Sequence, residues 1–167
     1  MATKFTGPAL SSDQELLSES STQLHPLGER MVTSDGRAFR YVHVGGTALV
    51  AGKLYDSAAS IANHANLAVT ATAAIGASAI TCTLGGTAVT ANQYEGGYLI
   101  VNDGTGAGQT FLIKSHAAQA TTTGNVTITL DDKIVTALDT TSKVCLIYNP
   151  YKDVTIHAAT EASQPVG

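Results

Sequence analysis

A glycine-rich loop is the first pattern in this chain that could bind a ligand. The segment "NDGTGAGQTFLIKS" covers residues 102–115 and contains Gly104, Gly106 and Gly108. Such loops bind phosphate when a helix follows, because the helix N-terminus and a lysine then face the anion. Here the spacing is G-x-G-x-G, and the residues after the loop favour a strand. We therefore expect a hairpin loop rather than a nucleotide site.

The histidines are the next residues that could carry chemistry. None of them has the H-x-x-x-H or H-E-x-x-H spacing that places two metal ligands on one face. The chain contains His25, His43, His64, His116 and His157. We expect each to be a surface histidine or a hydrogen-bonded loop histidine, and we expect no metal site.

Asp131 and Asp132 form an adjacent acidic pair, which is a candidate for acid–base catalysis. However, adjacent residues of a strand point to opposite faces, and the sequence "LDDK" is typical of a turn. No serine lies in a G-x-S-x-G motif, and neither cysteine has the sequence context of a nucleophile. The sequence therefore predicts neither an enzyme nor a cofactor.

Cys82 and Cys145 leave two structural interpretations open. They are too few and too far apart in sequence for a zinc knuckle, which needs closely spaced ligand pairs. Two buried free thiols are one interpretation. A single disulfide is the other, provided that the two Cα atoms lie within about 7 Å.

The composition argues against several classes of partner. Hydrophobic residues make up 44% of the chain, charged residues make up 13%, and the formal net charge is -4. Lys and Arg are scattered singly, whereas nucleic-acid binding needs a basic stripe.

The most apolar run, "LAVTATAAIGASAI" at residues 67–80, is interrupted well before the ~20 residues of a membrane span. The first residues lack a secretory pattern, so we expect synthesis in the cytoplasm, and neither a nucleic-acid nor a membrane partner.

Alternation of apolar and polar residues identifies the elements that would position these side chains. The alternating segments are separated by turn residues, as in antiparallel β proteins. They are "SAITCTLGG" (78–86), "YLIV" (98–101), "QTFLIKSH" (109–116), "NVTITLDD" (125–132) and "KVCLIYNPYKDVTI" (143–156). The last is interrupted at Asn149–Pro150, because proline cannot donate to a central ladder. We predict an all-β fold with an antiparallel sandwich or barrel as its body.

Composition also divides the chain into three parts. Residues 1–38 show no sustained hydrophobic period and predict an extended N-terminal arm, with a disordered tail as the alternative. Ser12 and Glu15 fit a capping box, so a short helix could begin within this arm. Residues 39–157 predict the β-rich body, and residues 158–167 predict an extended C-terminal tail.

Three stretches of the sequence resemble a known family. They are "DGRAFRYVHVGGTALVAGKLYDS" (35–57), "ANQYEGGYLIVNDGTGAGQTFLIKSH" (91–116) and "KVCLIYNPYKDV" (143–154). In this order, they resemble the capsid decoration, or cement, proteins of tailed bacteriophages. The resemblance extends over roughly residues 35–167.

The resemblance implies a β-rich body on the capsid exterior of the virion, as homotrimers between capsomers, with an N-terminal arm that adds contacts. The expected partners are therefore the major capsid protein and further copies of this chain. The candidate capsid contacts are the apolar side chains of the arm, namely Phe5, Leu10, Leu16, Leu17, Leu24 and Leu27. One alternative is a tail, baseplate or fibre module that binds a host glycan or a neighbouring tail protein. Another is a non-viral binding module, or an enzyme whose site assembles only in three dimensions.

Overall fold

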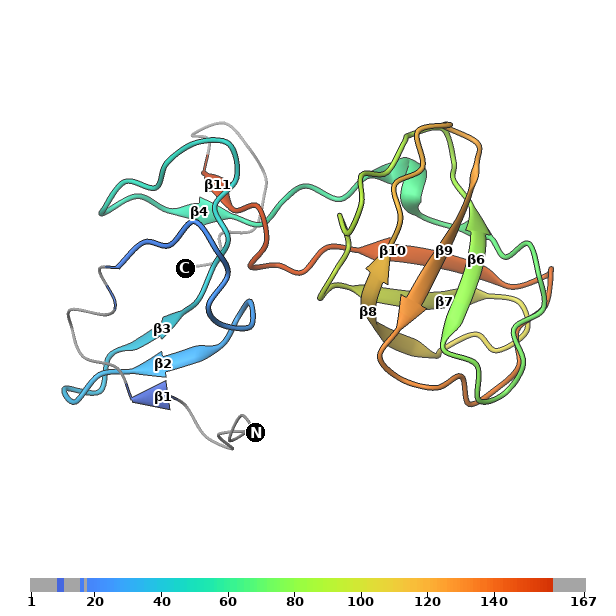
Figure 1. Cartoon of the computed structure of the whole chain (residues 1–167), viewed down its shortest axis with the longest axis horizontal. Helices are drawn as coiled ribbons and strands as arrows, with labels where there is room; N and C mark the ends of the chain where they lie inside the picture. The colour runs from blue at the N-terminus through green and yellow to red at the C-terminus, as the bar shows by residue number, and fades with distance from the viewer. Residues whose placement is uncertain (1–8, 11–15, 17, 158–167) are drawn as a thin grey trace. The chain divides into compact units, whose positions relative to one another are not determined.

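The computed structural model describes residues 9–10, 16 and 18–157 of the chain. The chain divides into two compact units, one formed by both terminal regions and one by the middle of the sequence. We call Met1–Ala58 with Pro150–Gly167 the terminal unit, and Ala59–Asn149 the barrel. Figure 1 labels most of the strands of each unit.

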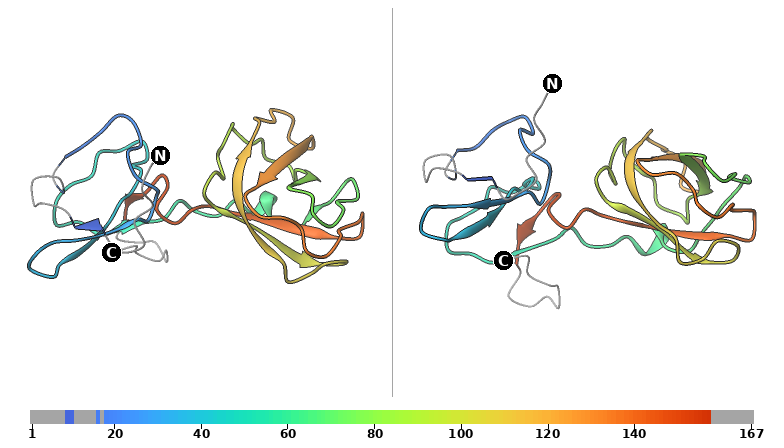
Figure 2. Two further views of the ribbon diagram at one scale, coloured as in Figure 1. Left: turned by 60° about the horizontal axis from the view of Figure 1, so that its bottom comes forward. Right: turned by 90° about the horizontal axis from the view of Figure 1, so that it is seen from below.

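The barrel is a sheet of six antiparallel strands that nearly closes into a ring. Its strands are β5 (Leu67–Ala68), β6 (Ala79–Thr83), β7 (Tyr98–Asp103), β8 (Thr110–His116), β9 (Asn125–Leu130) and β10 (Lys143–Ile147). Their order in the sheet is β5-β10-β7-β8-β9-β6. A bridge between Val69 and Cys82 then joins the two outermost strands, and the amide of Thr70 donates to the carbonyl of Thr81 at 2.9 Å. Figure 2 shows these strands curling round a common interior.

Period-two alternation fills this interior with apolar side chains. In β9, Val126, Ile128 and Leu130 are buried, whereas Asn125 and Thr127 are exposed. The buried side chains on the other strands include Ile80, Leu99, Val101, Phe111, Ile113, Val144 and Leu146. The predicted all-β fold is confirmed, and the near closure of the sheet makes the body a barrel rather than a sandwich. A short 3-10 helix, η1 (Ala62–His64), precedes β5.

The terminal unit contains two small sheets. One consists of β1 (Ala9–Leu10), β2 (Arg30–Val32) and β3 (Ala38–Arg40), in that order. In this sheet β2 is the central strand: β1 is parallel to β2, and β3 is antiparallel to β2. The other sheet pairs β4 (Tyr55–Asp56) with β11 (Thr155–Ile156), which brings together segments from opposite ends of the sequence.

The boundaries predicted from composition differ from these units. The predicted division after residue 38 falls inside the β2–β3 hairpin, whose turn is closed by the amide of Gly36 donating to the carbonyl of Thr33 at 3.0 Å. Residues 39–58 and 150–157 consequently belong to the terminal unit, not to one continuous body. At residue 38 the reason is that an Asp-Gly turn pairs the residues on its two sides. Residues 150–157 join the unit because β11 pairs with β4.

The predicted interruption at Asn149–Pro150 coincides with the point where the chain leaves the barrel. β10 ends two residues before Asn149, and the next strand, β11, pairs in the terminal unit instead. The segment predicted as the last pair of strands therefore contributes one strand to each unit.

Candidate functional site

The glycine-rich loop is the hairpin between β7 and β8, as predicted. Gly104 and Gly106 have φ angles of 76° and 79°, in the left-handed region that favours glycine. A Cβ atom on Gly104 would lie 2.3 Å from the carbonyl oxygen of Thr141, so the loop also packs closely on a neighbouring loop. Its glycines are thus explained by backbone geometry.

The carboxylates near this end of the barrel have structural partners or are exposed. Asp139 accepts hydrogen bonds from the hydroxyls of Thr141 at 2.6 Å and Thr105 at 2.8 Å. These bonds, that from Thr141 above all, hold the pKa of Asp139 below its usual value. Asp131 and Asp132 are exposed in the bend after β9, which agrees with the predicted turn.

Two histidines are buried in the barrel around one tyrosine. Nδ1 of His64 lies 2.6 Å from the hydroxyl oxygen of Tyr94, and Nε2 of His64 lies 2.8 Å from the carbonyl oxygen of Thr87. Nε2 of His116 accepts a hydrogen bond from the amide of Tyr94 at 3.0 Å, and Nδ1 of His116 lies 3.0 Å from the carbonyl oxygen of Ala117. Each ring therefore has one partner that accepts and one that donates, which fits the two nitrogens of a neutral imidazole.

The three histidines of the terminal unit each contact a carboxylate. The pairs are His25 with Glu29 at 3.1 Å, His43 with Asp153 at 2.8 Å, and His157 with Asp56 at 2.9 Å. All five histidines thus have hydrogen-bonding partners, but His64 and His116 are buried in η1 and β8, so they are neither the surface nor the loop histidines that were predicted. Within the described residues, no group of three or more His, Cys, Asp or Glu side chains could hold a metal ion.

Both cysteines are free thiols in the described structure, so the disulfide interpretation is wrong. Cys82 is fully buried in the core of the barrel, and this burial raises the pKa of its thiol to about 12. Cys145 is only half-buried, and its sulfur accepts the amide of Asn66 at 3.3 Å. Of the two thiols, only Cys82 fits the predicted buried state.

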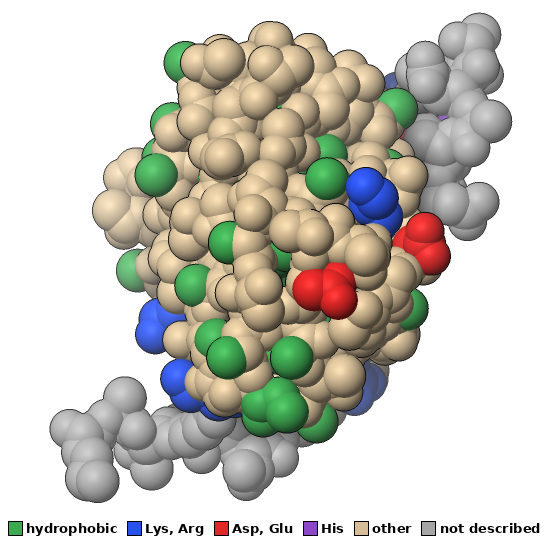
Figure 3. Space-filling model, turned by 90° about the vertical axis from the view of Figure 1, so that its right-hand side faces the viewer, with side chains coloured by type: hydrophobic (Ala, Val, Ile, Leu, Met, Phe, Trp, Pro, Cys, Tyr) green, Lys and Arg blue, Asp and Glu red, His purple; other side chains and the backbone are tan. Residues whose placement is uncertain are grey.

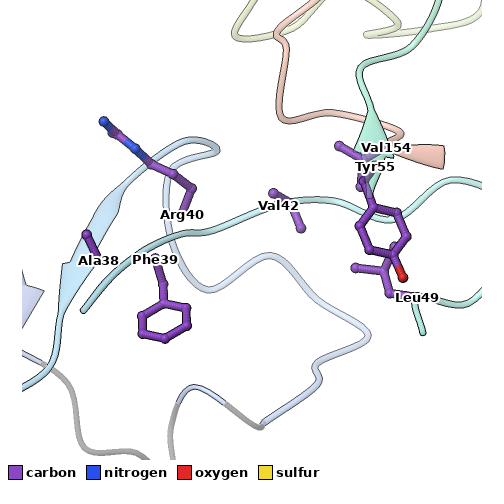
Figure 4. Close-up of a pocket in the computed structure, with 7 residues that line it drawn as sticks. All are labelled: Ala38, Phe39, Arg40, Val42, Leu49, Tyr55 and Val154. Atoms are coloured by element: carbon purple, nitrogen blue, oxygen red, sulfur yellow. The ribbon is translucent and has the colours of Figure 1, made fainter. Parts of the chain in front are cut away.

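A pocket of about 390 Å³ lies beside β3 in the terminal unit (Figure 4). All three residues of β3 line it, so the pocket follows the length of this strand. Phe39 extends to one side of the strand and Arg40 to the other (Figure 4). The remaining lining residues are Val42, Leu49, Tyr55 and Val154. The pocket has the size of a ligand site, and its lining is mostly apolar.

Arg40 is held in a defined position at this pocket. Its Nη1 donates to the carbonyl of Gly28 at 2.7 Å, and its guanidinium lies 5.9 Å from the ring centre of Tyr151. A Cβ atom on Gly28 would lie 2.5 Å from the Tyr151 ring, so glycine is what allows this ring to pack there. Arg30 is the direct cross-strand partner of Arg40, which places two positive side chains side by side on one face of the sheet.

The two units differ sharply in how much apolar surface they bury. The barrel has one continuous core of buried apolar side chains. Among residues 18–58 and 150–157, by contrast, the buried residues are Thr33, Asp56 and Val154. Large exposed apolar side chains occur on both units: Leu24, Leu49, Val50 and Leu54 on the terminal unit, and Ile75, Tyr98, Val135 and Ile147 on the barrel.

The sequence-predicted contact residues are only partly placed by the structure. Phe5, Leu17 and the side chain of Leu10 lie outside the described residues, as do the predicted helix start at Ser12 and the tail 158–167. Leu24 is 68% exposed, whereas Leu16 and Leu27 are partly buried. Of the described candidates, Leu16, Leu24 and Leu27 do not line the pocket.

Sequence reasoning missed the pocket because its lining comes from separate segments. Ala38 to Tyr55 lie within the stretch 35–57, but Val154 joins them only through tertiary structure. No alternation or motif links these positions. The available signal was the Asp-Gly turn, which predicts the hairpin that creates the β3 edge.

Comparison of the chain with protein-family models, curated proteins and solved structures found no match. Among the residues that the structure describes, no helix has the length and apolar character to cross a membrane.

The face of the barrel shown in Figure 3 carries few charged side chains, which lie among hydrophobic and uncharged polar ones.

Proposed function

We propose that this chain is a decoration, or cement, protein of a tailed-bacteriophage capsid. It would bind the outer surface of the shell of major capsid protein, as trimers that bridge capsomers, and stabilise that shell. The proposal assigns it no catalytic step, metal or cofactor. It is supported by the resemblance of residues 35–57, 91–116 and 143–154 to that family.

The uneven burial of apolar side chains is the observation that carries the proposal. The barrel has a core of its own, whereas the described part of the terminal unit buries Thr33, Asp56 and Val154. The described part alone buries too little apolar surface for a unit of this size to be stable without covalent or metal staples. Docking on a large partner surface would supply that burial.

Exposed apolar side chains on the terminal unit support the same conclusion. Leu49, Val50 and Leu54 lie close together in sequence, and Leu49 also lines the pocket. Contiguous exposed apolar groups mark interaction surfaces, so this segment is the candidate contact of the terminal unit. A contact of about 800 Å² per partner is standard, and a symmetric shell would repeat it many times.

Binding to undecorated phage shells tests the proposal. We expect the wild-type chain to sediment with the shells, and the variant Leu49→Ser/Leu54→Ser to bind at least about tenfold more weakly, because burial of each leucine contributes ~1.5–3 kcal/mol. The matched control is Tyr98→Ser/Ile147→Ser, which removes exposed apolar side chains from the barrel. Equal binding by both variants would contradict a docking role for the terminal unit.

The copy number of the chain in purified particles separates the proposal from its nearest alternative. Quantitative mass spectrometry should give a ratio to the most abundant shell protein that is near one or a simple fraction. A handful of copies per particle would instead support the tail, baseplate or fibre interpretation. Absence from particles would exclude both.

A further inference from the structure

Among the described residues, β3 is one of the two outer strands of its sheet, and its open edge runs along the pocket. In an antiparallel pair, alternate residues direct their backbone groups toward the partner strand and away from it. The amide of Tyr41 donates to the carbonyl of Glu29 at 3.0 Å, so this residue faces the β2 side. By alternation, Ala38 and Arg40 direct their N–H and C=O groups to the open edge. Such an edge is able to hydrogen-bond an added strand.

The two sides of this edge differ in chemistry. Phe39 extends to one side, where Val42 and Leu49 complete an apolar lining. Arg40 extends to the other side, next to its cross-strand partner Arg30. Side chains of an added strand would alternate between these two sides, because successive residues of a strand point to opposite faces.

The arginine pair lacks a negative partner within the described terminal unit. Like charges directly opposite each other on adjacent strands are destabilising. Four carboxylates of the described unit are already engaged, since three pair with histidines and Asp35 pairs with Arg37 at 2.6 Å. Arg40 uses Nη1 for the carbonyl of Gly28, which leaves its other N–H groups available for a carboxylate from outside.

We propose that the open edge of β3 binds an extended segment of a partner protein in which apolar and acidic residues alternate. Backbone groups of Ala38 and Arg40 would pair with the segment. Its carboxylates would face Arg30 and Arg40, and its apolar side chains would enter the pocket beside Phe39. The identity of the partner as the shell protein rests on the proposed function, whereas the chemistry of the segment does not.

A protein segment fits this site better than a nucleic acid does. Binding along a phosphate backbone requires a row of cations, whereas this site has one arginine pair in a chain with a net charge of -4. Alternation of acidic and apolar side chains satisfies both sides at once.

A short peptide of alternating valine and glutamate is the direct probe. Titration into the full-length ¹⁵N-labelled chain should shift the amide signals of Ala38 and Arg40 and leave the barrel signals in place. A peptide with lysine in place of glutamate should bind at least about tenfold more weakly, because it places like charges together. A peptide with serine in place of valine should also bind more weakly, because the pocket is then unfilled.

Three variants separate the contributions of charge and backbone. Arg30→Glu/Arg40→Glu should lower the affinity at least about tenfold and should reverse the preference toward the lysine peptide. Ala38→Pro removes the outward N–H of the edge and should weaken every peptide, although edge strands tolerate proline. Lys53→Glu/Lys114→Glu changes the net charge equally at exposed positions and should bind as the wild type does. Unchanged amide signals of β4 and β11, which belong to the terminal unit but lie outside the substituted strands, will confirm that this unit is folded in each variant.

The inference would be overturned if the glutamate and lysine peptides bound equally well. It would also be overturned if Arg30→Glu/Arg40→Glu bound the glutamate peptide as tightly as the wild type does. Shifts produced equally by inorganic phosphate at the same concentration would overturn it too. If Ala38→Pro and Arg30→Glu/Arg40→Glu leave shell binding unchanged, the proposed function stands and this site is wrong. Peptide binding by a chain that never binds shells would support the site and contradict the function.

Discussion

At the scale of single residues, Tyr94 is the centre of the buried polar network of the barrel. Its hydroxyl bonds His64, its amide bonds His116, and its ring centre lies 4.6 Å from that of Tyr148. Burial, with a further contribution from Tyr148, raises the pKa of the Tyr94 phenol above its usual value. The hydroxyl therefore stays protonated and can donate to His64 throughout the physiological pH range.

We expect Tyr94→Phe to destabilise the barrel by about 1–3 kcal/mol. The change leaves Nδ1 of His64 buried without its donor, and an unsatisfied buried acceptor has a cost of this size. Urea unfolding followed by fluorescence or circular dichroism measures the difference in the free energy of unfolding. Tyr98→Phe, which removes a hydroxyl from a residue that is 44% exposed, is the control and should change stability little. Equal effects of the two substitutions would contradict the role given to Tyr94.

At the scale of elements, the β2–β3 hairpin depends on its turn. The hydroxyl of Thr33 donates to Asp35, and Nε of Arg37 donates to the same carboxylate at 2.6 Å. These bonds, with that from Thr33 the largest contribution, lower the pKa of Asp35 from 3.8 to about 2. The turn thus positions β3, and with it the edge that lines the pocket.

The hairpin should lose stability in acid through Asp35. Because the carboxyl has a lower pKa in the folded state than in the unfolded state, its ionised form favours folding. That contribution is complete above the unfolded-state pKa of 3.8 and is lost as the pH falls toward about 2. An NMR titration of the Asp35 carboxyl, read with the amide shifts of β2 and β3, measures both effects.

Asp35→Asn is the matched variant, since it keeps the shape and removes the titrating group. It should weaken the hairpin at neutral pH and abolish the acid transition of the β2 and β3 amide shifts. If those amides respond to acid in the same way with and without the substitution, Asp35 is not the responsible group.

At the scale of the whole molecule, stability is concentrated in the barrel. Its core side chains lie between Leu67 and Leu146, and its six strands pair with one another. The described part of the terminal unit is held instead by two small sheets and by side-chain hydrogen bonds such as that between His157 and Asp56 at 2.9 Å. We therefore expect the two units to have different stabilities.

Residues 59–149 expressed alone should fold and unfold cooperatively, because this segment contains all the strands of the barrel and its core. In the full chain without a partner, limited proteolysis should cleave the terminal unit first and leave a fragment close to these bounds. Calorimetry and mass spectrometry of the fragments test this. A terminal unit that resists protease as well as the barrel does would contradict the idea that it needs a partner to complete its burial.

The sequence by itself was sufficient to predict the fold class and most barrel strands. Alternation in "NVTITL" and "SAITCT" predicts which side chains face inward. These segments form β9 and β6, which pair with each other. The glycine spacing and the strand after it predicted the β7–β8 hairpin. The proline at position 150 marked where the chain leaves the barrel. These are local properties, since the period of a strand and the geometry of a turn depend on neighbouring residues.

Only the tertiary structure decided which distant segments meet. His157 and Asp56 are 101 positions apart, and β11 pairs with β4 rather than with a barrel strand. The pocket beside β3, which includes Val154, and the network around Tyr94 likewise join segments that no motif connects. The physical reason is that alternation specifies which face of a strand is buried but not which strand lies beside it. That choice depends on the burial and hydrogen bonding of the whole chain at once.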